Sequence, residues 1–151
     1  MLDSTLITWI LVIFGVIFIF APMLYAQFLM IIKPHSQKTK NIIIGKGQDW
    51  RDKTHFLAAY GLAWADLIIW LPAIAVGSIG VLLGYHWGYI VWAISGAISV
   101  YISITLWFME REYVYPSKGP WPYYTFYWGF FIYWGVAAVA YSIIRLVGIE
   151  I

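Results

Sequence analysis

A single acidic residue, Asp66, lies inside an otherwise uncharged apolar stretch over residues 56–83. A helix rises about 1.5 Å per residue, so Asp66 is expected roughly 15 Å inside a hydrocarbon core about 30 Å thick. An ionised carboxylate at that depth costs at least about 2.5–3.5 kcal/mol on insertion scales. We therefore expect Asp66 to be protonated, paired or turned to a polar cavity, and to be functional. The alternative is a hydrogen-bonded structural contact between helices.

Other polar side chains are expected at the depth of Asp66. Counting from the inner ends of the later apolar stretches brings Ser99 and Tyr133 to this level, with Tyr101 and Trp70 near it. A carboxyl among hydroxyl and indole donors can hold a proton, a cation or a polar ligand group. These five residues are the predicted ligand-binding or ion-binding set. For the tyrosines taken singly, a hydrogen bond that fixes helix register is the competing interpretation.

A second cluster of acidic residues with a histidine is predicted at the membrane surface. Its members are Asp49, Asp52, His55, Glu110 and Glu112. The first three recur every three residues, so they would share one face of a helix that begins near Gln48. Such a group can ligate a divalent metal or do acid-base chemistry. Neighbouring Arg and Lys residues make ordinary salt bridges the competing interpretation, and no HExxH motif or Gly-rich phosphate loop accompanies the cluster.

The cofactor is unknown from the sequence, but two kinds are not expected. The three histidines, His35, His55 and His86, are predicted at different depths, so they cannot be paired as axial ligands of one haem. The chain has no cysteine, which excludes cysteine-ligated iron–sulfur clusters and disulfides.

Composition identifies the class of protein that must position these residues. Hydrophobic residues make up 63% of the 151, charged residues only 11%, and the mean hydropathy is +0.80. This is far more apolar than a soluble domain, so the lipid bilayer is the expected environment. A net charge of +2 without a basic patch gives no reason to expect a nucleic-acid partner.

The apolar stretches predict an all-α integral membrane protein with a single domain. Four transmembrane helices are expected at about residues 7–32, 56–83, 87–109 and 123–147, in an antiparallel bundle. A short external hairpin at 84–88 joins the second and third spans. Pro22 and Pro72 are expected to interrupt their spans. Residues 41–44 are either a short strand or a dip into the interface, and the sequence leaves both open.

The distribution of positive charge predicts the orientation. Of the nine Lys and Arg residues, all but Arg145 fall in the loops over residues 33–55 and 110–122. The positive-inside rule places both loops in the cytoplasm and both termini outside. Residues 1–8 carry no basic charge and no small-residue cleavage site follows, so a cleaved signal peptide is not expected.

Small residues at helical spacing predict close helix contacts, which we assign to the interface between copies. The residues are Gly61, Ala65, Gly80, Gly84, Ser95, Ser99 and Ser103. Gly80 and Gly84 form a GxxxG pair, and the serines form a small polar ridge.

Three functions are compatible with these features. The first is a small oligomeric conduit or carrier in which Asp66 binds a proton, a cation or a cationic ligand. The second is an accessory or scaffold subunit of a larger membrane complex. The third is an interfacial enzyme that uses the acidic–histidine cluster. The first is favoured, because a pure scaffold has little reason to keep an intramembrane carboxyl. Access of water or a ligand to Asp66 would favour the conduit, and its closure by dry side chains the scaffold.

Overall fold

The structure, a computed structural model, describes residues 2–118 and 129–149, without the side chains of residues 110–118. The described segments are helical in this order: α1 (Leu6–Phe14), η1 (Gly15–Phe20), α2 (Ala21–Ile32), α3 (Gln37–Ile43), α4 (Lys53–Ala65), η2 (Asp66–Trp70), α5 (Leu71–Leu82), α6 (His86–Lys118) and α8 (Phe130–Leu146). The two η segments are π-helical.

The all-helical class predicted from composition is confirmed for the described residues, which contain no β-strand. Three continuous helices in this part of the chain are long and apolar enough to cross a membrane: Leu6–Ile32, Lys53–Leu82 and His86–Met109. Helix α8 is a shorter apolar helix of 17 residues. The first six residues of the expected fourth span, 123–128, lie outside the described residues.

The segment 41–44, left open by the sequence, is helical through Ile43, so the strand alternative is wrong. Ser36 caps α3, because its Oγ accepts a hydrogen bond from the Thr39 backbone N–H at 3.2 Å. The Thr39 hydroxyl in turn donates to the Lys33 carbonyl at 2.7 Å. Ile44, directly after the helix, is fully buried. Capping and burial of one apolar side therefore favour a helix over an extended segment.

Helix α4 begins five residues later than the expected start near Gln48. Asp52 is its N-cap, and its Oδ1 accepts from the His55 backbone N–H at 2.9 Å. Gly45 and Gly47 precede it with φ of 144° and 79°, a backbone conformation that other residues rarely adopt. These glycines turn the chain from α3 back along α4, so Asp49 lies before the helix rather than on it.

The two expected proline interruptions take the form of π-helical turns just before the prolines. Segment η1 directly precedes the first turn of α2, which contains Pro22, and η2 directly precedes the first turn of α5, which contains Pro72. Proline lacks the N–H that a regular helix needs, and a π turn is one way to continue around it.

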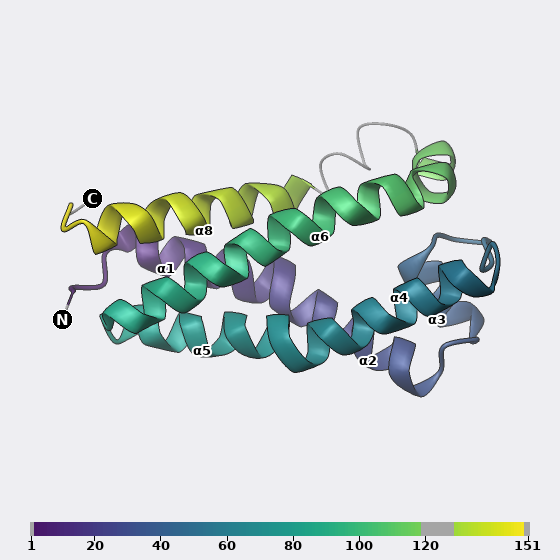
Figure 1. Ribbon diagram of the computed structural model, residues 1–151, viewed down its shortest axis with the longest axis horizontal. Coiled ribbons are helices and arrows are strands. Elements are labelled where there is room, and N and C mark those ends of the chain that lie inside the picture. Colours follow the sequence, from purple (N-terminus) through teal and green to yellow (C-terminus); the bar gives the residue numbers. More distant parts are fainter. Residues whose placement is uncertain (1, 119–128, 150–151) are drawn as a thin grey trace.

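Glycines allow α6 to pack closely against both of its main neighbours, α5 and α8 (Figure 1). A Cβ atom added to Gly80 of α5 would lie 2.5 Å from the Cα of Gly88. One added to Gly96 would lie 2.6 Å from the carbonyl oxygen of Gly135 in α8. These helix pairs can approach to this distance only because the side chains are absent.

The two ends of the molecule differ in what they hold (Figure 1). At one end, residues 2–5 meet the turn between α5 and α6 and the last turn of α8: the Leu2 N–H donates to the Gly84 carbonyl at 2.8 Å. This end is named the turn end. At the opposite end, named the loop end, residues 33–52 and α3 pack beside α2 and the start of α4.

Candidate functional site

The central feature of the candidate site is a hydrogen bond between two helices that buries Asp66. The Gln27 side-chain amide donates from Nε2 to Asp66 Oδ2 at 2.7 Å. Asp66 is 1% exposed and Gln27 6%. The second carboxyl oxygen, Oδ1, has no hydrogen-bond partner among the described residues. The pair therefore satisfies one oxygen of a buried carboxyl and leaves the other unsatisfied.

Local structure explains why these two side chains meet. Asp66 is the first residue of η2, and Gln27 lies in α2, which packs against both α4 and η2. Between the pair and the loop end, Met30 of α2 packs with Ala59 and Ala63 of α4 in a small buried cluster. The alanines let α2 approach closely, and this brings the Gln27 amide within reach of the carboxyl.

The remaining residues predicted around Asp66 point elsewhere. The Trp70 indole N–H donates to the Ser95 carbonyl at 3.0 Å, and the Ser99 hydroxyl donates to the Phe131 carbonyl at 2.9 Å. Tyr101 is 71% exposed and Tyr133 63% exposed, so both lie on the outer surface of the bundle. The structure brings none of the four into a hydrogen bond with Asp66.

Depth counting placed Asp66 and Ser99 at one level, and the contacts agree with this. Trp70 meets Ser95 across the helix pair, and Asp66 and Ser99 each lie four residues, about one helical turn, further toward the loop end. What depth does not give is rotation about the helix axis. Asp66 faces α2 and not α6. Gln27, the strongly polar side chain of its helix, is the partner that depth counting missed.

Most of the small residues predicted as helix contacts are used inside the chain. Gly80 faces Gly88, and Ser95, Ser99 and Ser103 are almost fully buried. A Cβ on Gly84 would meet the backbone of Leu2. These residues are therefore not available on the surface for a contact between copies. Gly61 and Ala65 differ, since both lie on the outer surface of α4 and a Cβ on Gly61 would meet nothing within 4 Å.

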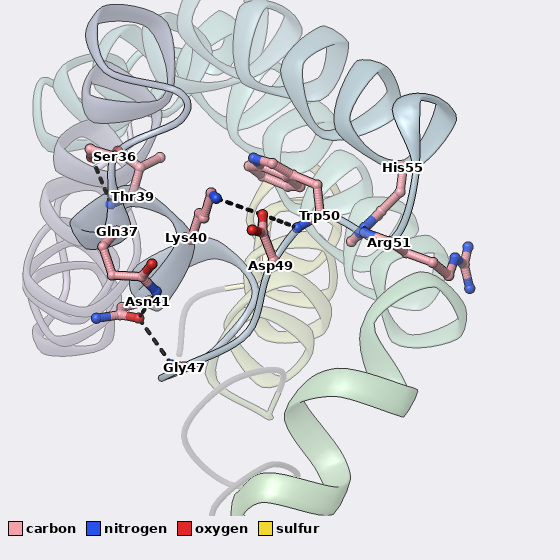
Figure 2. A network of polar contacts seen from close by, with 10 residues as sticks. All are labelled: Ser36, Gln37, Thr39, Lys40, Asn41, Gly47, Asp49, Trp50, Arg51 and His55. Atoms are coloured by element: carbon pink, nitrogen blue, oxygen red, sulfur yellow. Dashed lines mark hydrogen bonds and ion pairs between the residues drawn. The ribbon is translucent and has the colours of Figure 1, made fainter.

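At the loop end, acidic residues are held by hydrogen bonds and ion pairs, and Figure 2 shows those of Asp49. Lys40 Nζ lies 2.6 Å from Asp49 Oδ1, and the Trp50 backbone N–H donates to the same oxygen at 2.7 Å. The Lys40 hydrogen bond, followed by that of Trp50, holds the pKa of the Asp49 carboxyl below its ordinary value of 3.8. The bond from His55 N–H likewise lowers the pKa of Asp52.

The predicted metal-binding face is therefore not formed by Asp49, Asp52 and His55. Asp49 precedes the helix, Asp52 caps it, and His55 Nδ1 accepts a hydrogen bond from the Arg51 backbone N–H at 3.2 Å. Within the described residues, no group of three His, Asp or Glu side chains is close enough together to hold a metal ion. The side chains of Glu110 and Glu112 lie outside the described part of the chain.

Comparison with known proteins gives no relative from which a function could be transferred. No protein-family model, no curated protein and no solved structure matches the chain. The function is therefore inferred from the chemistry of the Asp66 and Gln27 pair.

Proposed function

We propose that the chain is a small multi-pass membrane conduit or carrier in which Asp66, supported by Gln27, binds a proton or a cation. The observation that carries the proposal is the Oδ1 atom of Asp66, which is buried and has no partner among the described residues. Leaving a buried polar atom unsatisfied costs about 1–3 kcal/mol, and more for a charged group. A small cation on this oxygen would satisfy it, and a proton would remove the charge that makes its burial most costly.

The backbone around Asp66 supports the proposal. The Leu71 N–H donates to the Asp66 carbonyl, five residues back, and Pro72 has no N–H to donate to the carbonyl of Ile68. The turn after Asp66 thus departs from the regular helical pattern. Such π turns occur frequently at functional sites, and irregular backbone next to a carboxyl can supply further oxygen ligands for a cation.

We also propose four spans in an antiparallel bundle, with α8 in the fourth, the loop end in the cytoplasm and the turn end outside. Two features favour this arrangement. Residues 2–5 and the end of α8 lie at the same end as the turn between α5 and α6 (Figure 1). Eight of the nine Lys and Arg residues lie in the segments 33–55 and 110–122.

A conduit of this size is proposed to work as an oligomer. Trp70, Trp92 and Trp134 fill the interior of the described bundle, so the chain alone encloses little room for a path. Of the predicted contact residues, Gly61 and Ala65 keep their small side chains on the surface. We place the contact between copies along this side of α4, where the absence of bulk allows close approach.

One observation favours a second candidate, an accessory subunit of a larger membrane complex. Asp66 is 1% exposed, so side chains close over it in this state. A carrier passes through such a closed state during its cycle, whereas a scaffold would stay in it. The two candidates therefore differ in whether the carboxyl exchanges its proton or cation with the aqueous phase.

The exchange of protons or cations through the purified chain can be measured in vesicles with an internal pH dye and an imposed proton or cation gradient. Asp66→Asn keeps the shape of the side chain but removes its charge change. We expect it to reduce flux about tenfold or more, with helix content unchanged. Asp3→Asn, the same change at an exposed acid, is the matched control and is expected to retain wild-type flux.

Infrared titration provides an independent readout. If Asp66 exchanges protons, a carboxyl stretch should change between about pH 5 and 9 in the wild type and be missing in Asp66→Asn.

Equal flux in the wild type, Asp66→Asn and empty vesicles would reject the conduit. It would leave the accessory subunit as the better proposal.

A further inference from the structure

A buried guanidinium at the turn end has no acidic partner among the described residues. Arg145, in the last turn of α8, is 1% exposed. Its Nη2 donates to the backbone carbonyl of Asp3 at 2.6 Å, while Nε and Nη1 have no partner within residues 2–118 and 129–149. The ion pairs between described side chains, Lys40 with Asp49 and Arg51 with Asp52, lie at the opposite end. A buried cation without a counter-charge is expensive in any low-dielectric environment.

Further buried polar atoms at this end also have no partner in the described part of the chain, and each belongs to a group that can donate a hydrogen bond. They are Ser142 Oγ, Tyr89 Oη and Trp92 Nε1. Ser142 lies three residues before Arg145 on the same buried side of α8. The Tyr89 and Trp92 rings lie 6.2 Å and 6.4 Å from that of Tyr141, one turn before Arg145. In the described part of the turn end, several buried groups that can donate hydrogen bonds, together with Arg145, are thus left without partners.

The residues that cover this cluster are held mainly by backbone contacts. The Asp3 carbonyl lies on Arg145, and the Leu2 N–H donates to the Gly84 carbonyl. The Thr5 hydroxyl is 2.7 Å from the hydroxyl of Tyr141. Leu2 also packs against the core of the bundle, yet residues 2–5 form no helix, and such segments open more readily than packed helices. The Asp3 carbonyl is a neutral oxygen at the position where an anionic oxygen would bind the guanidinium more strongly.

We infer that Arg145, with the hydroxyls of Tyr89 and Ser142, forms a binding site for a phosphate group, covered by residues 2–5. A phosphate offers more acceptor oxygens than a carboxylate, which suits a cluster with several free donors. The last turn of α8 is the depth at which lipid phosphates meet a spanning helix. The phosphate can therefore come from a lipid headgroup or from the aqueous phase. This inference is independent of the role of Asp66.

Two binding measurements on the full chain in detergent micelles separate the two sources. Equilibrium dialysis with radiolabelled inorganic phosphate tests the free anion. Native mass spectrometry with phosphatidylglycerol tests the lipid, and diacylglycerol with the same acyl chains is the phosphate-free comparison. Binding of inorganic phosphate identifies the free ion. Retention of phosphatidylglycerol over diacylglycerol, without binding of inorganic phosphate, identifies the headgroup.

The variants remove the donors one at a time. Arg145→Gln is expected to weaken binding of the active probe about tenfold to a hundredfold, the effect of losing hydrogen bonds from a charged donor. Tyr89→Phe, which removes only a hydroxyl, should weaken it about two- to tenfold. Arg51→Gln removes the same charge at the loop end and should bind as the wild type does.

Two results would overturn the site. One is that the wild type binds neither inorganic phosphate nor phosphatidylglycerol in preference to diacylglycerol. The other is that Arg145→Gln and Tyr89→Phe bind the active probe as tightly as the wild type. If circular dichroism shows that Arg145→Gln loses its helices, Tyr89→Phe decides the question alone.

Discussion

At the scale of single residues, two buried ionisable side chains, Asp66 and Arg145, have different kinds of hydrogen-bond partner. Asp66 receives a donor from the side chain of Gln27, and Arg145 donates to the backbone carbonyl of Asp3. In both, part of the charged group keeps no partner among the described residues. Each unsatisfied buried group costs free energy that packing must offset. For this reason we propose an exchangeable ligand for each, a proton or a cation for Asp66 and a phosphate group for Arg145.

Asp49 at the loop end provides a residue-scale prediction on pH. Its pKa in the folded chain is below 3.8, its ordinary value, because the charged form is bonded to Lys40 and Trp50. The contact therefore contributes stability above pH 3.8, and this is lost as the pH falls through the lower, folded pKa. The Trp50 backbone N–H should therefore lose its protection from hydrogen exchange, corrected for the intrinsic rate, as the pH falls below 3.8.

Asp49→Asn is the control for this titration. An amide cannot titrate, so protection of Trp50 in the variant should be flat over the same range of pH. Protection that falls equally in the wild type and in Asp49→Asn would assign the effect to another acid, and Asp52 at the start of α4 would then be the first to test.

At the scale of elements, close helix contacts are made where glycines face each other. Gly80 with Gly88 joins α5 to α6, and Gly96 with Gly135 joins α6 to α8. Both contacts involve α6, which makes it the element against which its neighbours are aligned. The π turns lie in the other two long helices, next to Pro22 and Pro72. In the helix Lys53–Leu82 the two features lie apart, since the π turn Asp66–Trp70 precedes the close contact at Gly80.

Replacing a single glycine by alanine tests whether the close contact at Gly80 stabilises the fold. Gly80→Ala places a Cβ 2.5 Å from the Cα of Gly88, so the helices must move apart, and the free energy of unfolding should fall by about 1–3 kcal/mol. Gly61→Ala places its Cβ in open space, and the better helix propensity of Ala should leave stability equal or raise it by up to about 1 kcal/mol. Denaturant titration in mixed micelles, followed by circular dichroism, measures both. Equal destabilisation by the two changes would contradict this use of Gly80.

The elements show what a sequence can and cannot give. Runs without charge predict the long helices well, because the bilayer imposes one length and one polarity on every span. The start of α4 was wrong by five residues, since the Asp52 cap competes with an equally plausible earlier start. Small residues predicted close contacts but not which surfaces they join. Gly80 therefore meets another helix of its own chain and not a second copy.

The candidate site was predicted in part. Asp66 is identified by its cost in a membrane, and depth follows from counting residues along a helix. Its partner depends on how each helix is rotated, which a single sequence with weak polar patterning does not specify. Tyr101 and Tyr133 therefore lie on the outer surface instead, and Gln27, outside the predicted site, provides the hydrogen bond.

At the scale of the whole molecule, charge divides the two ends. The loop end holds the ion pairs of Lys40 and Arg51, whereas the turn end holds Arg145, which has no acidic partner among the residues that the structure describes. The proposed orientation, with the loop end in the cytoplasm, follows from the positive-inside rule, because eight of the nine Lys and Arg residues lie in the segments 33–55 and 110–122.

Single cysteines test that orientation cleanly, because the chain has none of its own. Lys46 at the loop end and His86 at the turn end are both exposed. With a membrane-impermeant maleimide added outside intact cells, His86→Cys should react and Lys46→Cys should react only after permeabilisation. Detergent-solubilised samples of both variants, which should label equally, are the control. The reverse pattern in intact cells would invert the proposed topology.

The contacts of residues 2–8 at the turn end also constrain the order in which the contacts of the chain can form during its synthesis at the ribosome. Thr5 and Thr8 bond to Tyr141, and Asp3 to Arg145, across separations of 136, 133 and 142 residues. Translation at about 5–20 residues per second needs roughly 7 to 28 s to add 142 residues. Until then, Thr5 and Thr8 can bond to each other at the start of α1 but not to Tyr141, which has not been synthesised. Residues 2–8 thus reach these contacts only after α8 has been translated.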